Sequence, residues 1–223
     1  MNNLLKSFFL LASISLVACS SSDEPEVILS LDQATVDALY QQVDSMSIQQ
    51  LQADDNAMEL AHWLFSQNCS SCHQADAKGR MGVPDLTDQY WLFEGTEESI
   101  RHTITSGRVG VMPEFGSQIG EMELGLLVSY VESLSNNEEL GANELTGQAI
   151  YQEFCIACHA EDGTGIANLG PNLTDEAWQW GGNMITIRQS ITTGRNAECP
   201  AHDELLSSAQ IDLLTAYLGQ LGS

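Results

Sequence analysis

The motif Cys-x-x-Cys-His occurs twice in this chain, at residues 69–73 and at 155–159. Two cysteines separated by two residues and followed directly by histidine are typical of a c-type haem attachment site. On one helical turn both thiols can reach the two vinyl groups of one haem, and the adjacent imidazole then binds the iron. The motifs therefore predict two covalently bound haem c groups, attached through Cys69, Cys72, Cys155 and Cys158, with His73 and His159 as iron ligands.

Each cysteine pair has plainer alternatives, namely a disulfide, half of a zinc site or a redox dithiol. A zinc site would need further cysteines or histidines at matching spacing, and a thioredoxin-like dithiol would need a βαβ context. The sequence supplies neither of these, so haem attachment is the interpretation that we favour.

The similarity between the two halves extends well beyond the motif. Residues 84–88 (Pro-Asp-Leu-Thr-Asp) align with residues 171–175 (Pro-Asn-Leu-Thr-Asp), and the pattern Ile-Arg-x-x-Ile-x-x-Gly-Arg begins at residues 100 and 187. The chain therefore holds two copies of one domain, which we place at residues 54–137 and 138–223. Because each copy is small, a covalently held haem would form much of its core.

Met112, followed by Pro113, is the expected sixth ligand of the first haem. A thioether is a soft, neutral donor, and Met/His ligation raises the reduction potential of haem. The proline rigidifies the loop, so that Met112 can reach the iron instead of packing inside a helix. In the second copy, Cys199 and Pro200 occupy the equivalent positions.

Cys199 is a spare thiol, and in an oxidising compartment such a thiol is a liability unless it is paired, buried or bound. We expect it to bind the second iron, where a thiolate would lower the potential of the second haem below that of the first. His202 is the rival ligand. A third alternative is a vacant or water-bound site, in which Cys199 is an inert buried thiol.

Two tryptophans and two arginines recur near the predicted haem edges. Trp91 aligns with Trp178, and Arg108 aligns with Arg195. Their indole N–H and guanidinium groups could donate hydrogen bonds to haem propionates, although packing and surface charge are alternative roles. We include all four among the predicted haem-binding residues.

The N-terminus is typical of an exported lipoprotein. Residues 8–17 are nearly all apolar or small, which is too short for a membrane span and suits a signal-peptide core. Leu-Val-Ala-Cys at 16–19 resembles a bacterial lipobox, which implies a signal peptide at 1–18, lipidation of Cys19, and a tether with a spacer helix at 19–53. The following serine favours the outer membrane. In the alternative, an ordinary secretory signal, Cys19 has no role.

The charge is strongly negative, with 31 Asp and Glu against 7 Lys and Arg. Nucleic acids and anionic lipid surfaces would be repelled, so neither is an expected partner. A redox partner with a basic docking face is compatible with this charge.

With these motifs in view, the chain over about residues 55–223 resembles class I cytochrome c domains. It is more closely similar to the tandem domains in the dihaem subunit of cbb-type cytochrome oxidases. The resemblance implies an all-α fold of two tandem haem-binding domains, and a subunit that passes electrons from a donor to the oxidase core. That family carries a transmembrane anchor in place of the lipobox and a second methionine in place of Cys199.

Two functions follow from these observations. The first is a periplasmic, lipid-anchored dihaem c-type cytochrome that carries electrons between respiratory protein partners. The second is a dihaem oxidoreductase of a small sulfur compound, resembling thiosulfate dehydrogenases only in its His/Cys-ligated haem, so that enzymatic activity is left open. We favour the carrier, because the second half has only Arg188 and Arg195 to collect an anionic substrate.

Overall fold

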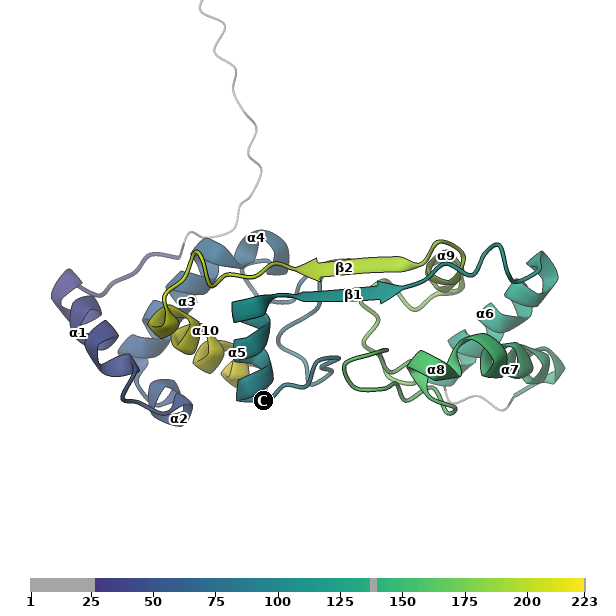
Figure 1. Cartoon of the computed structure of the whole chain (residues 1–223), viewed down its shortest axis with the longest axis horizontal. Helices are drawn as coiled ribbons and strands as arrows, with labels where there is room; N and C mark the ends of the chain where they lie inside the picture. The colour runs from purple at the N-terminus through teal and green to yellow at the C-terminus, as the bar shows by residue number, and fades with distance from the viewer. Residues whose placement is uncertain (1–26, 137–139, 223) are drawn as a thin grey trace, which may run out of the picture.

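A computed structural model describes residues 27–136 and 140–222 of the chain (Figure 1). The predicted signal peptide and Cys19 lie outside the described residues. The described part consists of α1 (Gln33–Val43), α2 (Ile48–Gln52), α3 (Asp55–Asn68), α4 (Ser70–His73), α5 (Glu97–Ser106), β1 (Arg108–Met112), α6 (Glu121–Asn136), α7 (Ala142–Phe154), α8 (Ile156–His159), α9 (Met184–Thr193), β2 (Arg195–Cys199) and α10 (Ser208–Leu221).

Helix α3 leads directly into the first haem motif. The Asp54 side chain accepts a hydrogen bond from the amide of Ala57 at 3.0 Å and so caps the start of the helix. The buried residues of α3 follow helical spacing and form one apolar face, consisting of Ala57, Leu60, Ala61, Leu64 and Phe65. The helix ends at Cys69, and α7 ends in the same way at Cys155.

The helices pack into two units at opposite ends of an elongated molecule (Figure 1). The first unit contains α1 to α5 together with α10, and its core is built around α3 and α10. The second unit contains α6 to α9, with α6 packed along α7. The C-terminal helix of the first copy, α6, therefore packs in the second unit, and the C-terminal helix of the second copy, α10, packs in the first unit. The two sequence repeats and the two packed units thus divide the chain differently.

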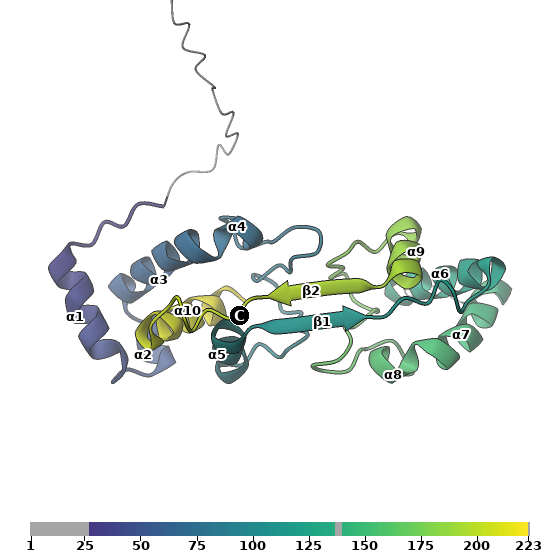
Figure 2. The same cartoon turned by 45° about the horizontal axis from the view of Figure 1, so that its top comes forward.

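Two strands make this exchange of segments. β1 and β2 pair antiparallel, with Arg108 opposite Cys199 and Met112 opposite Arg195. This two-stranded ribbon, made of β1 and β2, runs between the two units in both views (Figures 1 and 2). Residues 108–136 thus reach the second unit, and residues 195–221 return to the first, as in a domain swap within one chain.

The ribbon corrects the all-α prediction: the described residues are mostly helical, but the segments expected to be ligand loops include a two-stranded sheet. Along β1 and β2, exposed positions alternate with half-buried ones. Val109 and Val111 lie on the exposed side, while Arg108, Gly110 and Met112 lie on the inner side. The paired residues are separated by 83 to 91 positions of sequence, so neither strand carries a local hairpin signal.

The segment that precedes the first repeat packs onto the exchanged helix. Val36, Leu39, Val43 and Leu51 of α1 and α2 belong to the core of the first unit. The Gln52 side chain also donates a hydrogen bond to the carbonyl of Ala216 in α10 at 3.0 Å. The expected spacer helix is therefore two short helices that hold α10 in place. Within the described ranges, none of the helices is long and apolar enough to span a bilayer.

Candidate haem sites

The cysteines of both motifs lie at equivalent places in the two units. Cys69 and Cys155 each end a long helix, and a four-residue helix then carries the second cysteine and the histidine. Burial raises the pKa of Cys69 and of Cys155 to about 12. Both cysteines also pack against the apolar core of their own unit.

The two histidines are held so that one ring nitrogen stays available. The Nδ1 atom of His73 lies 3.2 Å from the carbonyl oxygen of Pro84, and that of His159 lies 2.9 Å from the carbonyl oxygen of Pro171. A carbonyl can only accept, so Nδ1 carries the proton and Nε2 keeps its lone pair for a metal. Burial lowers the pKa of both rings, which favours the neutral, ligating form.

The residue after each histidine has a strained backbone. Gln74 has φ 64° and ψ 165°, and Ala160 has φ 63° and ψ 168°, a region that is almost exclusive to glycine. The two copies share this strain directly beside the predicted iron ligand. It turns the chain sharply from each histidine into the loop that carries the accepting proline.

Met112 lies in the second unit, and not with the first motif as the repeat predicted. Its side chain packs against the same apolar cluster as Cys155 and Phe154. The loop that follows is fixed there, because the amide of Phe115 donates to the carbonyl of Ile191 in α9 at 2.9 Å. The thioether of the first sequence copy therefore lies in the unit that holds the second haem motif.

Cys199 lies in the first unit. Its thiol is close enough to Cys72 for a charge there to raise the pKa of Cys199, although burial is the larger cause, and Cys199 similarly acts on the pKa of Cys69. The loop that follows is fixed by the amide of His202, which donates to the carbonyl of Ile104 in α5 at 3.0 Å. The sulfur of the second copy thus lies in the unit that holds the first haem motif, and not with the second motif as the repeat predicted.

A glycine of each sequence copy lies against the ligand residue of the other copy. Gly107 has φ 72° and ψ 177°, and a Cβ atom there would lie 2.6 Å from the carbonyl oxygen of Cys199. Gly194 has φ 70° and ψ −179°, and its Cβ would lie 2.4 Å from the carbonyl oxygen of Met112. Each glycine permits both the unusual backbone and the close approach of the opposite ligand segment. The repeated Gly-Arg pairs in the sequence are explained by this contact.

His202 gives the first site a polar atom that the second site lacks. Among the described residues, its Nδ1 atom is buried with no hydrogen-bond partner. Phe115 takes the equivalent place in the second unit and packs edge-on against Phe154 at 6.0 Å between ring centres. A buried, unpartnered ring nitrogen in the unit that holds Cys199 and His73 fits a site that accepts a further polar group.

Three of the four predicted propionate donors already donate hydrogen bonds within the protein. Arg108 donates to the hydroxyl of Thr103 at 3.1 Å, Arg195 donates to the hydroxyl of Ser190 at 2.9 Å, and the Trp178 indole donates to the carbonyl of Asp175 at 3.1 Å. The Trp91 ring lies against Gly95 and Gly222. Both arginines lie on the inner side of the ribbon, so propionate binding by these residues stays a prediction.

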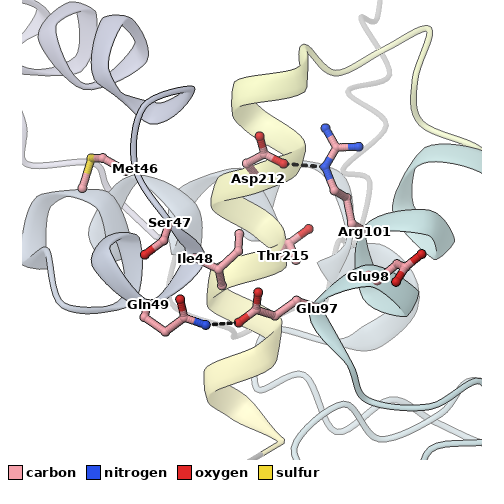
Figure 3. A pocket seen from close by; sticks show the side chains of 9 residues that line it. All are labelled: Met46, Ser47, Ile48, Gln49, Glu97, Glu98, Arg101, Asp212 and Thr215. Carbon is pink, nitrogen blue, oxygen red and sulfur yellow. Dashed lines mark hydrogen bonds and ion pairs between the residues drawn. The ribbon is translucent and has the colours of Figure 1, made fainter.

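A surface pocket of about 470 Å³ lies away from these groups, between α2, α5 and α10 (Figure 3). Arg101 crosses it to an ion pair with Asp212, at 2.6 Å between Nε and Oδ1, and Glu97 accepts from the Gln49 amide. The ion pair joins α10 to α5, and the hydrogen bond joins α2 to α5. The pocket therefore marks a seam of the exchanged helix, and none of the predicted haem-binding or iron-binding residues lines it.

Trp180 is a residue of this region that the sequence did not single out. The guanidinium carbon of Arg195 lies 4.6 Å from the centre of the Trp180 ring, and Phe93 holds the equivalent place under Arg108 at 4.8 Å. Aligning the two repeats would have paired Trp180 with Phe93. The change from phenylalanine to tryptophan gave no reason to expect a contact with the other unit.

The family model described as "Cytochrome C oxidase, cbb3-type, subunit III" matches residues 56–131 and again residues 142–218. The chain belongs to this family. Relatives named cbb3-type cytochrome c oxidase subunit CcoP are 39% identical over 187 residues in Rubrivivax gelatinosus and 33% identical over 200 residues in Cereibacter sphaeroides. Subunit FixP of Azorhizobium caulinodans is 38% identical over 170 residues.

These matches cover 82%, 82% and 71% of this chain, and 60%, 69% and 57% of the respective relatives. The chain therefore spans about three-fifths of the length of the relatives it matches. Two tandem cytochrome c domains carry two covalently attached haem c groups. The two Cys-x-x-Cys-His turns, with an oriented histidine in each, fit that cofactor.

Proposed function

We propose that this chain is an electron-carrying dihaem cytochrome whose two sites differ in their sulfur ligand. Haem iron, when bound, supplies one-electron redox chemistry. The protein's part is to hold the iron between His159 and Met112 in the second unit, and between His73 and Cys199 in the first. The observation that carries this proposal is the exchange of segments, which places Cys199 beside the first cysteine pair and Met112 in the second unit.

The difference in ligands should give the two haems different reduction potentials. A neutral thioether favours the reduced iron, whereas a thiolate favours the oxidised iron, and axial ligands are a main means of setting haem potentials. An electron would therefore rest on the second site and pass through the first only on the way in or out. Because the relatives are named as cytochrome c oxidase subunits, we propose a respiratory protein donor and a respiratory protein acceptor.

We propose, further, that the chain works in the periplasm and is held to a membrane through a lipid on Cys19. The lipobox-like sequence at 16–19 supports this. A Cys19→Ala variant should move the protein from the membrane fraction to the soluble fraction. Retention in the membrane fraction would refute lipidation as the anchor.

Low-temperature EPR of the oxidised, haem-loaded protein tests the ligands. We expect a low-spin thiolate signal that disappears in Cys199→Ser and persists in His202→Phe, a variant that copies Phe115 of the other unit. Loss of the signal only in His202→Phe would assign the site to histidine instead. Spectra that match in all three proteins would exclude both side chains.

A second experiment tests the exchange. A chain with Cys69→Ala and Cys72→Ala cannot attach the first haem, so it should lose the thiolate signal and keep the methionine signature. The matched chain with Cys155→Ala and Cys158→Ala should do the opposite. The reverse result would mean that each haem takes its sulfur ligand from its own sequence copy.

A further inference from the structure

Two hydrogen bonds to carbonyls at equivalent positions of the repeats join the units near the haem motifs. The amide of Gly82 donates to the carbonyl of Gln179 at 2.9 Å, and the amide of Asn168 donates to the carbonyl of Leu92 at 2.8 Å. Gln179 and Leu92 hold the same position in the two copies. Gly82 and Asn168 lie in the loops that lead to the prolines whose carbonyls accept from the haem-motif histidines. Each of these loops therefore rests on the other unit.

The contact at Gly82 is built more heavily than its counterpart. A Cβ atom at Gly82 would lie 2.7 Å from Cη2 of Trp180, so the indole sits directly against the glycine backbone, which has φ +84°. The Gln179 side chain also donates to the carbonyl of Gly82 at 2.8 Å. This part of the first unit's loop is thus clamped by a ring and by two hydrogen bonds.

The clamped loop is the one that orients His73. The amide of Arg80 donates to the carbonyl of Val83 at 3.1 Å, and the amide of Val83 donates back to the carbonyl of Arg80 at 2.7 Å. This tight turn has Gly82 inside it and leads directly into Pro84, whose carbonyl accepts from His73. A shift at Gly82 is therefore passed to the hydrogen bond on the histidine.

The indole of Trp180 also contacts a residue of β2, the strand that pairs with the Met112 segment. Arg195 stacks on the Trp180 ring and lies opposite Met112 in the ribbon. Its guanidinium is held in place by the hydroxyl of Ser190 at 2.9 Å and the carbonyl of Thr186 at 3.3 Å. A continuous set of packed groups thus runs from the methionine of one site to the histidine of the other.

We propose that Trp180 is a positioning residue that couples the redox properties of the two haem sites. Its contact with Gly82 holds the loop that keeps the Pro84 carbonyl on His73. Its contact with Arg195 links it to the strand that carries Met112, because Arg195 pairs with Met112. The hydrogen bond from Nδ1 makes a histidine a stronger donor to its metal, which favours the oxidised state. Loss of the indole should therefore favour reduction of the first haem. The proposal rests on the ligand assignment made above.

Redox titration of the full-length, haem-loaded protein tests this, with each haem followed by its own EPR signature. At the native midpoint of the first haem, Trp180→Leu should raise its reduced-to-oxidised ratio about fivefold, the effect of weakening one hydrogen bond. Trp180→Phe keeps a ring against Gly82 and should restore most of the native ratio.

A double-mutant cycle with Gly82→Ala separates coupling from general loosening. Gly82→Ala pushes against the indole, so its effect on the first haem should be smaller in the Trp180→Leu background than in the native one. Equal effects in both backgrounds, or an unchanged first-haem potential in Trp180→Leu with native haem content, would overturn the proposal. Failure of the ligand assignment would appear separately, as an EPR spectrum that Cys199→Ser does not alter.

Discussion

Replacing Gly194 with alanine should damage the site that holds Met112, although Gly194 and Met112 belong to different sequence copies. The backbone of Gly194, at φ 70° and ψ −179°, lies in a region that costs a side-chain-bearing residue about 1–3 kcal/mol. The added Cβ would also lie 2.4 Å from the Met112 carbonyl oxygen, and a methyl group has no rotamer that avoids a backbone atom. Together these give a loss of roughly 2–4 kcal/mol in the free energy of unfolding.

The assay has two parts, thermal unfolding and the visible charge-transfer band of methionine-ligated ferric haem. For a chain of this size the loss corresponds to a melting temperature lower by about 5–15 °C. Gly194→Ala should also weaken the methionine band, because Met112 must move away from its native place. Gly107→Ala is the matched variant, and it should spare the methionine band and alter the thiolate EPR signal of Cys199.

Two results would refute this reasoning. One is that Gly194→Ala alters the thiolate signal and Gly107→Ala the methionine band, which would mean that the ligand segments do not cross. The other is that both variants unfold at the native temperature, since the strained backbone and the close approach cannot both be present at no cost.

Three further predictions concern stability. Ala160→Gly should raise the free energy of unfolding by about 1 kcal/mol in denaturant titrations, because relief of the backbone strain exceeds the entropy that glycine adds to the unfolded chain, and an unchanged midpoint would contradict the strain. Burial, followed by the charges of Asp85 and Asp175, raises the pKa of Asp88, so ionised Asp88 costs the native state stability as the pH rises through that pKa. Asp88→Asn should therefore raise the melting temperature at pH 7 by about 1–2 °C and lose this advantage near pH 3, whereas a pH-independent gain would point to another cause. Leu214→Ala empties a fully buried position in α10 and should cost about 2–5 kcal/mol, with earlier thermal loss of the thiolate signal than of the methionine band; simultaneous loss of both would show that the units unfold together.

The mostly helical character of the fold could be predicted from the sequence, because the signals that form helices are local. Helix α3 shows an apolar face at helical spacing and an aspartate cap, and it ends at the cysteine that begins the motif. The repeat also identified Met112 and Cys199 as equivalent positions. It could not show which haem motif each one faces, because ordinary and exchanged arrangements of two similar copies bury nearly the same contacts.

Residues 108–112 and 195–199 decide which of those two arrangements forms. An exchange requires residues 108–112 and 195–199 to run straight as strands, whereas an unexchanged pair needs them to fold back as loops. Short segments with alternating valines are compatible with both forms until their distant partner is known. Trp180 was missed for a related reason, since its contact with Gly82 joins residues of different copies.

The return of α10 to the first unit has a consequence for how the protein is made. N-terminal domains usually fold first as a chain emerges. Here the first unit cannot close until α10 has appeared, because Leu213, Leu214 and Ala216 of that helix complete its core. Its haem motif thus stays accessible until α10 has been made, and premature termination anywhere before α10 leaves an exposed apolar surface that proteases can recognise.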